Sequence, residues 1–482
     1  MNQNRMPLYE ALIEFKERGP LSFHVPGHKN GLNFPQEAIR EFKGILSIDV
    51  TELAGLDDLH SPFECIDEAQ QLLAEVYNTK RSYFLINGST VGNLAMILSC
   101  CGEHDIVLVQ RNCHKSIING LKLAGANPIF LDPWIDEAYN VPVGVRNEII
   151  KNAIRKYPNA KALILTHPNY YGMGMDLEAS IAFAHAHKIP VLVDEAHGAH
   201  LCLGEPFPKS ALTYGADIVV HSAHKTLPAM TMGSYLHINS HLVDEDKVTT
   251  YLSMLQSSSP SYPIMASLDI ARFTMARIKE EGHSEIVEFL RRFKEQLRSI
   301  PQIAILEYPL QDELKVTVQT RCQLSGYELQ SVFEKVGIYT EMADPYNVLF
   351  ILPLQVNEGY MKVIEMIRVA LQHYEVKDKR ESIRYTYNGE FSLLPYTYKQ
   401  LDGYETKIVS IEDAVGMIAA EMVIPYPPGI PLIMYGERIT SEHKEQIMYL
   451  ERAGARFQGN TKYMKVYDIE SRFEDEGIIC NN

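Results

Sequence analysis

The feature of this sequence that most constrains its fold is a regular alternation of short apolar runs with amphipathic segments between residues 66 and 240. The apolar runs are too short for helices and predict strands, whereas the segments between them repeat their apolar residues at helical spacing. Such an alternation is typical of a mainly parallel sheet with helices on both faces. We expect strands at residues 82–86, 105–109, 128–131, 161–166, 191–194 and 217–221, and helices at 66–78, 91–101, 115–124 and 179–187.

The pattern changes after Pro263, where a long helical region at 264–298 leads into a smaller α+β pattern. This pattern predicts strands at 303–308, 314–318 and 348–352 and helices at 327–335 and 360–374. A chain of 482 residues is also too long for one ordinary core. We therefore expect an N-terminal segment (1–47), a large domain (48–290), a small α+β domain (291–380) and a C-terminal domain (381–482), with the charged stretch 377–387 as a linker.

Composition and charge exclude several classes of protein. The net charge of -16 argues against a nucleic-acid surface, because phosphate binding needs clustered Lys and Arg. The seven cysteines form no CxxC pair, which predicts reduced thiols and no metal site. The start of the chain has no apolar signal region, and the apolar stretch 414–436 contains Glu421 and four prolines, so we expect no membrane span and a cytoplasmic location.

Two predicted strands end in residues suited to one cofactor. Asp194 closes the apolar run 191–194, where a carboxylate can pair with a protonated pyridine nitrogen. Lys225 follows the run 217–221 closely, where a partly desolvated amine can form an imine. Taken alone, Asp194 is better interpreted as a loop cap and Lys225 as a solvated lysine. Because the carboxyl ends of neighbouring strands meet at one edge of a parallel sheet, the two residues together favour a joint site.

A third strand end adds a phosphate-binding element. The sequence Asn87-Gly88-Ser89-Thr90 joins a predicted strand to a helix, and the helix N-terminus with the Ser89 and Thr90 hydroxyls can cradle a phosphate. The segment lacks the Walker lysine and the GxGxxG spacing, so nucleotide-binding motifs do not fit. A phosphate cradle, an imine-forming lysine and a carboxylate for a ring nitrogen together indicate pyridoxal 5'-phosphate (PLP). His114, after the strand at 105–109, could stack on such a ring or be a structural histidine.

These segments resemble those of a known family, the bacterial Orn/Lys/Arg decarboxylases. The similar segments occur in the same order along the chain, at 23–29, 49–60, 87–90, 111–116, 194–200 and 222–225, and the resemblance resumes at 426–431 and 436–437. It implies the aspartate-aminotransferase fold, which is PLP fold type I, with a mainly parallel sheet in the large domain and smaller α+β C-terminal domains.

The resemblance also implies roles for individual residues. Lys225 is the lysine that binds PLP covalently, Asp194 the partner of the ring nitrogen, and His114 the histidine stacked on the ring. The residues implied around the phosphate are Ser89, Thr90, Ser222 and His224. Ala196 is implied on the ring face opposite His114, and His197 near the 3-hydroxyl. The segment 256–263 resembles one that reaches the active site of a partner subunit, which implies a homodimer with shared sites.

The chain departs from the family at two positions and in its length. Ala223 stands where many relatives have a hydroxyl residue, so one phosphate contact is expected to be missing. Asn169 stands where a threonine is expected, and its role is open. The receiver-like N-terminal wing of the large acid-inducible members is lacking, so the chain resembles the short type, in particular biosynthetic arginine decarboxylases.

The implied reaction is the α-decarboxylation of a basic amino acid in polyamine metabolism, with arginine favoured and lysine or ornithine possible. His224 or Lys225 would return the proton to Cα. The acids that could bind the cationic side chain are Glu437, Glu52, Asp57 and Asp58, although each is also readable as a surface acid and Asp57-Asp58 as a cap. An aminotransferase on the same fold is the alternative, with Arg384 or Arg456 binding a substrate carboxylate, and a PLP-binding protein without catalytic activity is the third class.

Overall fold

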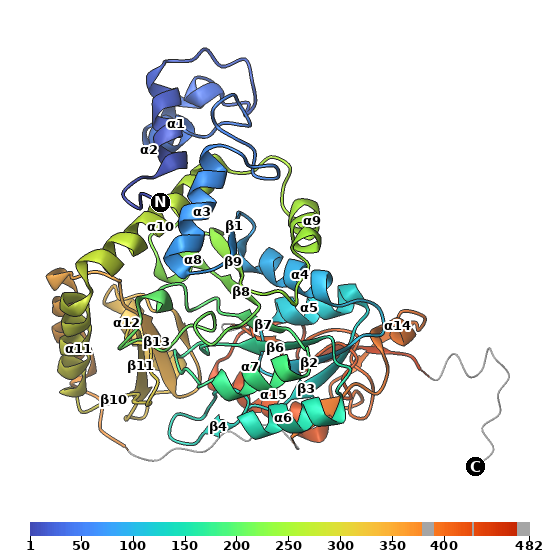
Figure 1. The fold of residues 1–482 in the computed structure, drawn as a ribbon. Coiled ribbons are helices and arrows are strands. Elements are labelled where there is room, and N and C mark those ends of the chain that lie inside the picture. The colour runs from blue at the N-terminus through green and yellow to red at the C-terminus, as the bar shows by residue number, and fades with distance from the viewer. Residues whose placement is uncertain (378–389, 427–428, 470–482) are drawn as a thin grey trace. The chain divides into compact units, whose positions relative to one another are not determined.

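The computed structural model describes residues 1–377, 390–426 and 429–469 (Figure 1). Most of the predicted linker 377–387, together with Arg384, lies outside the described residues. The chain forms two compact units. The first contains residues 1–100, 176–181 and 190–284, and the second contains the described residues of 101–175, 182–189 and 285–482. No helix in the described ranges is both long and apolar enough to cross a membrane.

The first unit contains four strands in the order β1-β9-β8-β7. Their bounds are β1 (Arg81–Leu85), β9 (Ser234–Ile238), β8 (Ile218–His221) and β7 (Val191–Asp194). β7 and β8 are parallel, whereas β9 is antiparallel to both β8 and β1. The predicted strands at 82–86, 191–194 and 217–221 are thus confirmed to within one residue. β9 is an additional strand, and it pairs with β1 and β8.

Helices pack on both faces of this part of the sheet. Helix α4 (Gly88–Cys100) lies so close to one face that a Cβ on Gly92 would be 2.7 Å from Leu85 and 2.8 Å from Val220. On the other face, the ring of Tyr77, at the end of α3 (Cys65–Tyr77), lies 4.5 Å from the ring of His237. Because side chains alternate along a strand, Asp194, which pairs with Val220, belongs to the α4 face.

The remaining helices of the first unit are α1 (Pro7–Glu17), η1 (Lys29–Gly31), α2 (Gln36–Leu46), η2 (Leu201–Leu203), α8 (Ala223–Thr226), α9 (Glu245–Leu255) and α10 (Tyr262–Glu281). Of these, α1 and α10 pack against α3 and α9 packs against α4, and Figure 1 shows α1 and α2 together in blue. A buried ion pair of 2.6 Å between Arg272 and Asp269 in α10 also fixes α1, because Asp269 accepts the backbone N–H of Leu8 at 3.0 Å. Burial raises the pKa of Asp269, and Arg272 lowers it.

The long helical region predicted at 264–298 is wrong as one helix. It is divided into α10, which ends at Glu281, and α11 (Ser284–Arg298). Gly282, with a φ of +87°, breaks the helix between them, because residues with a Cβ rarely adopt that conformation.

The second unit contains a parallel group of strands, β6 (Ala162–Thr166), β2 (Ile106–Gln110) and β3 (Asn127–Leu131), followed by the antiparallel β14 (Phe391–Leu393). The helices that follow these strands are α5 (Lys115–Ala124), α6 (Asn147–Lys156) and α7 (Glu178–Ala186), the last of which contributes residues to both units. A short hairpin is formed by β4 (Ile135–Asp136) and β5 (Val141–Pro142). The strands and helices predicted in this region are confirmed, with ends shifted by one residue at most.

Three smaller sheets complete the described part of the second unit, and two of them are the antiparallel pairs β15-β18 and β16-β17. The third has the order β10-β11-β13-β12, with all neighbours antiparallel. The strands of this sheet are β10 (Ile303–Ile305), β11 (Lys315–Thr320), β12 (Met342–Ala343) and β13 (Asn347–Ile351). The helices in the same stretch of the chain are α12 (Gly326–Lys335), η3 (Glu358–Met361) and α13 (Lys362–Leu371). The C-terminal elements are α14 (Tyr398–Leu401), β15 (Thr406–Ser410), β16 (Ile424–Pro425), α15 (Ser441–Ala453), β17 (Phe457–Gln458) and β18 (Tyr463–Tyr467). They surround an apolar cluster that includes Ala414, Val423 and Ile433.

Candidate active site

Asp194 is a buried carboxylate at the carboxyl end of β7. Only 3% of the residue is exposed. Its Oδ2 accepts a hydrogen bond of 2.9 Å from Asn93 Nδ2 in α4, and its Oδ1 accepts one of 3.1 Å from the backbone N–H of Ala196. A carboxylate held by an amide and a backbone donor is fixed in orientation. Asp194 can therefore pair with a cationic group on the α4 face of the sheet.

Lys225 lies in the short helix α8, directly after β8. Its Nζ is 2.9 Å from His197 Nε2. Because an ammonium group can only donate, His197 accepts at Nε2 whenever Lys225 is charged. The neighbouring His224 has its Nδ1 at 3.0 Å from the carbonyl oxygen of Gly233. A carbonyl can only accept, so this contact places a proton on His224 Nδ1.

The start of α4, which follows the turn after β1, contacts the residue before α8, although the two are far apart in the sequence. Ser222 Oγ donates a hydrogen bond of 2.8 Å to Ser89 Oγ. Gly88 has a φ of +77°, and a Cβ there would have no atom within 4 Å, so the turn borders open space. Thr90 is exposed and Ser89 is half-buried. Hydroxyl groups, a helix N-terminus and open space are the features that a phosphate group needs.

These residues of the first unit fit PLP. The fit rests on a buried carboxylate for the ring nitrogen, an amine that contacts His197 in the turn after that carboxylate, and a hydroxyl-rich turn at the N-terminus of α4 for the phosphate. Ala196 and His197 are both buried in the turn that follows Asp194. The structure thus groups Asp194, Ala196, His197, Ser222, His224, Lys225, Ser89 and Thr90 in one unit.

His114 belongs to the second unit and caps the start of α5. Its Nδ1 accepts a hydrogen bond of 3.2 Å from the backbone N–H of Ser116. Nδ1 is therefore the unprotonated nitrogen, and a neutral His114 carries its proton on Nε2. Gly429 lies against the ring, because a Cβ on that glycine would be 3.3 Å from His114 Cδ2. The orientation of the His114 ring is thus fixed on both sides.

Glu437, a predicted ligand of the substrate side chain, forms an ion pair with Arg111. Arg111 Nη2 lies 3.1 Å and 3.0 Å from the two carboxylate oxygens, and Glu437 Oε2 also accepts the backbone N–H of Met434 at 2.9 Å. Arg111 further donates to the carbonyl oxygens of Pro431 and Leu432. This pair connects the predicted motif at 111–116 to the segment around 429–437 within the second unit.

The other three predicted acids differ in their partners. The Asp57 carboxylate is buried and accepts backbone hydrogen bonds at the start of α3 from Asp58, Phe63, Glu64, Ile66 and Asp67. It therefore organises the loop that leads into this helix. Asp58 is half-buried and accepts the backbone N–H of His60 at 2.9 Å. Glu52 is exposed, with a hydrogen bond from Thr51 Oγ1.

Residues 256–263, which are expected to reach the active site of a partner subunit, make contacts within their own chain. Gln256 Oε1 accepts the backbone N–H of Ile86 at 2.8 Å, and the backbone N–H of Ser257 donates to Asn87 Oδ1 at 3.3 Å. The segment therefore supports the turn that carries Gly88. The open role of Asn169 is also structural, because its Oδ1 accepts the backbone N–H groups of Tyr171 and Met173.

Two groups of functional interest were missed by sequence reasoning. The first is Asn93, whose signal is an amide in an otherwise apolar part of α4. The second is a row of buried polar side chains on the α3 face, Glu195, His221, His237 and Ser82. Polar residues at strand positions that face the interior were the available signal for these, and period-two alternation could have found them.

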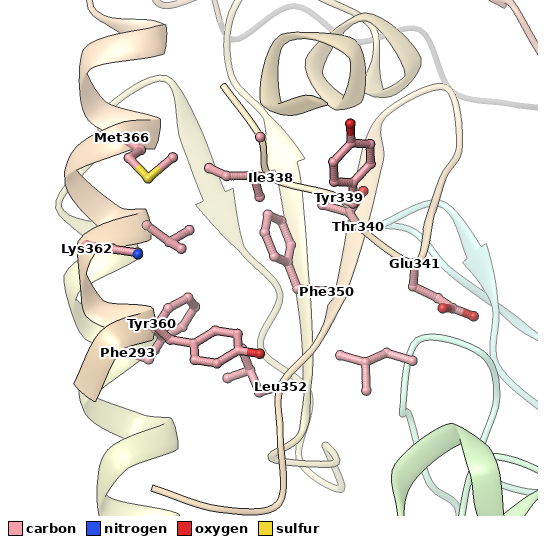
Figure 2. A pocket seen from close by; sticks show the side chains of 13 residues that line it. Phe293, Ile338, Tyr339, Thr340, Glu341, Phe350, Leu352, Tyr360, Lys362 and Met366 are labelled. Carbon is pink, nitrogen blue, oxygen red and sulfur yellow. The ribbon is translucent and has the colours of Figure 1, made fainter. Parts of the chain in front are cut away.

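A cavity of about 540 Å³ also lies in the second unit (Figure 2). Figure 2 shows aromatic and aliphatic side chains around it, with Lys362 on α13 and Glu341 as its charged members. Its lining includes Phe293, Tyr339, Phe350, Leu352 and Tyr360. It contains none of the residues predicted for the site.

The chain matches two models of one protein family. Residues 6–322 match the family model for the major domain of Orn/Lys/Arg decarboxylases, and residues 386–465 match the one for the C-terminal domain. The chain is 50% identical over 465 residues to the "Uncharacterized protein YaaO" of Bacillus subtilis (strain 168), with 95% of this chain and 96% of that protein covered. It is 34% identical over 472 residues to an arginine decarboxylase of the same organism, again with 95% and 96% covered.

The fold is similar to that of a solved lysine decarboxylase. The crystal structure of LdcF from Francisella novicida superposes with a TM-score of 0.80 at 20% identity, covering 96% of this chain and 81% of that chain. The predicted PLP fold type I is thereby confirmed.

Proposed function

Because the chain belongs to the Orn/Lys/Arg decarboxylase family, we propose that it removes the α-carboxyl group of arginine and supplies agmatine to polyamine metabolism. Members of this family are PLP-dependent decarboxylases of basic amino acids, and this chain is such an enzyme. The observation that carries the choice of arginine is the 34% identity to an arginine decarboxylase along nearly the whole of both chains. Lysine and ornithine are the competing substrates.

The proposed cofactor contacts follow the residues described above. Lys225 would hold PLP covalently, Asp194 would pair with its ring nitrogen, and His114 would stack on the ring. Ala196 would lie on the opposite ring face and His197 near the 3-hydroxyl. The phosphate would be bound by Ser89, Thr90, Ser222 and His224. The support for this set is the Asp194–Asn93 hydrogen bond, the Lys225–His197 contact and the Ser222–Ser89 contact, all within the first unit.

When bound, PLP supplies an electron-withdrawing ring that stabilises the carbanion left by the loss of CO2. The negative charge of Asp194 favours the protonated form of the ring nitrogen, and Asn93 keeps that carboxylate in place. Loss of CO2 leaves Cα in need of a proton, which His224 or Lys225 would deliver. Since His224 Nδ1 donates to Gly233, a proton moved by this histidine passes through Nε2.

The proposed ligands of the substrate's cationic side chain are Glu52 and Asp58. Asp57 uses its carboxylate for backbone amides, and Glu437 is paired with Arg111, so neither has the same capacity to bind a guanidinium group. Glu52→Gln and Asp58→Asn are expected to raise the KM for arginine while the absorption of bound PLP stays unchanged.

We also propose a cytoplasmic homodimer in which residues 256–263 complete the site of the partner subunit. Gln256 and Ser257 contact the turn that carries Gly88, which supports a place for this segment near the cofactor. Sedimentation of the purified protein tests the dimer, and a monomer with full activity would contradict it.

The substrate is tested by incubating the purified enzyme separately with arginine, lysine and ornithine and measuring both CO2 and the amine product. Agmatine formation at the highest kcat/KM supports the proposal. Cadaverine or putrescine at a higher kcat/KM would replace arginine by lysine or ornithine. Product formation that depends on an added keto acid would indicate the aminotransferase alternative. Lys225→Ala is the control, and it should lose both the absorption band of lysine-bound PLP and CO2 release.

A further inference from the structure

Asp194 and Glu195 are adjacent carboxylates whose side chains lie on opposite faces of the first unit's sheet. Asp194 is held by Asn93 on the α4 face. Glu195 Oε1 lies 3.5 Å from His221 Nε2, and His221 in turn lies beside the Tyr77 ring of α3, at 5.2 Å between ring centroids. Glu195 and His221 are both fully buried, and neither has a role in the function proposed above.

His221 continues into a row of polar contacts across β8, β9 and β1. His221 Nδ1 lies 3.0 Å from His237 Nε2, and His237 Nδ1 lies 2.7 Å from Ser82 Oγ. The strand register explains the row. Ser82 of β1 pairs with His237 of β9, and His221 of β8 pairs with Tyr235, two positions before His237 and on the same face of β9. We call Glu195, His221, His237 and Ser82 the buried polar chain.

The direction of the hydrogen bonds in this chain depends on residue 195. Glu195 Oε2 accepts the backbone N–H of Ala211 at 2.7 Å, so Oε1 is the oxygen that faces His221. With Glu195 ionised and both histidines neutral, we expect the proton of His221 on Nε2, facing the carboxylate. His237 then donates from Nε2 to His221 Nδ1, and Ser82 donates to His237 Nδ1. Burial lowers the pKa of His237 well below 6.5. Among the described residues, Glu195 Oε1 and His221 Nε2 have no hydrogen-bond partner, and they face each other in an ion-pair contact of 3.5 Å.

The Glu195–His221 contact connects the end of β7, which leads to His197, with the end of β8, which leads to Lys225. On one side, the turn after β7 folds over the Glu195 side chain, since a Cβ on Gly198 would be 2.5 Å from Glu195 Cγ. That turn contains Ala196 and His197. On the other side, His221 is the last residue of β8 and directly precedes Ser222. A change at either partner therefore moves a loop that leads to Lys225.

We propose that Glu195 and His221 are positioning residues of the cofactor site, which hold the ends of β7 and β8 together from the face opposite Asp194. This inference rests on the proposed roles of Asp194, His197 and Lys225. The buried polar chain would then fix the distance between the turn at His197 and Lys225.

The first test uses the full chain labelled with ¹⁵N-histidine and freed of cofactor. Wild-type protein is expected to show the Nε2–H form of His221 and His237. In Glu195→Gln, the side-chain oxygen stays on the Ala211 N–H and the amide group donates to His221 Nε2, so both histidines should switch to the Nδ1–H form. Glu205→Gln, which changes an exposed acid of the same loop region, is the matched control and should leave both unchanged. Histidine forms that do not respond to residue 195 would overturn the proposal.

The second test measures the Kd of PLP by absorption. Glu195→Gln keeps an acceptor for the Ala211 N–H and a polar group facing His221, and it should bind PLP within a few-fold of wild type. Glu195→Leu leaves two buried groups without a partner and should weaken binding by roughly tenfold or more. Equal affinity in the folded leucine variant, or an equal loss in both variants, would overturn a positioning role. If the leucine variant does not fold, the glutamine variant alone decides, by its affinity and its histidine forms.

The proposed function and this inference fail in different ways. Loss of the function shows as wild-type protein that does not form the absorption band of lysine-bound PLP, or forms it without Lys225. Failure of the inference shows as unchanged histidine forms and PLP affinity in the Glu195 variants of a protein that does form the band.

Discussion

Asn93 donates a hydrogen bond of 2.9 Å to Asp194 and thereby connects the middle of α4 to the end of β7. The two residues come from segments about a hundred positions apart, and both are almost fully buried. Asn93 is thus the side chain that orients the carboxylate expected to pair with the cofactor. Its removal tests whether that orientation matters.

Asn93→Leu should weaken PLP binding by about 1.5–3 kcal/mol, which is roughly 10- to 100-fold in Kd, because a buried carboxylate loses a hydrogen bond made to its charged form. Asn93→Asp should weaken binding as well, since it places a like charge beside Asp194. Titration of the cofactor-free protein with PLP, followed by absorption, gives both values. An Asn93→Leu variant with wild-type affinity would show that Ala196 N–H alone is sufficient.

Asp57 is expected to act on stability and not on substrate binding. Asp57→Asn cannot accept as strongly from the five backbone N–H groups at the start of α3, so the free energy of unfolding should fall by about 1–3 kcal/mol. The KM for arginine should stay within twofold. Asp58→Asn is the matched variant, with the reverse outcome expected. A large rise in KM for Asp57→Asn at unchanged stability would return Asp57 to the substrate site.

Arg111 and Glu437 should be strongly coupled. Arg111→Met leaves a largely buried carboxylate without its cation and should cost about 3 kcal/mol of stability in the second unit. Combining it with Glu437→Leu should recover part of that loss, because no unpaired charge then remains. The fluorescence of Trp134, which is the single tryptophan of the chain and lies in the second unit, reports the unfolding. Additive effects of the two substitutions would contradict the coupling.

His443 should make the second unit less stable at acidic pH. Burial lowers its pKa below 6.5, with nearby Arg111 lowering it and Glu437 raising it. Above pH 6.5 both folded and unfolded forms are neutral, so His443 has no effect. Below it, the unfolded chain takes up the proton first, and stability falls by about 1.4 kcal/mol for each pH unit until the folded form is also protonated.

His443→Gln is the variant that isolates this effect. Glutamine at the same position of the capping box with Thr440 keeps the helix start of α15 but does not titrate. Denaturant unfolding followed by Trp134 at pH 7 and pH 5.5 should therefore show a smaller loss in the variant than in wild type. The same loss in both proteins would assign the pH dependence to other groups.

Much of the fold could be predicted from the sequence, because its strands are short apolar runs and its helices are amphipathic. β7 and α5 have the predicted bounds, and the other elements that were predicted before residue 240 differ by a few residues at most, whereas the helix α6 was not predicted. The break at Gly282 could not be located, since both flanking segments have helical periodicity. β9 was also missed, and its alternating Tyr235 and His237 do not form an apolar run.

The site could be predicted only in part. Asp194, Lys225 and the turn at Gly88 were found because they follow apolar runs. The partner of each polar group depends on the tertiary structure: Glu437 was an isolated acid in the sequence, and the structure shows its pairing with Arg111. Sequence spacing likewise could not separate Asp57, whose carboxylate collects backbone amides, from its neighbour Asp58.

The alternation at the end of β7 makes strand register a condition of catalysis. Asp194 and Glu195 are chemically near-equivalent, and only their place in the pleat directs one to Asn93 and the other to His221. A single-residue insertion or deletion within β7 would exchange the two acids between the faces of the sheet. A sequence could therefore keep every motif of this site and still be inactive, which makes the spacing within 191–195 as restrictive as the identity of its residues.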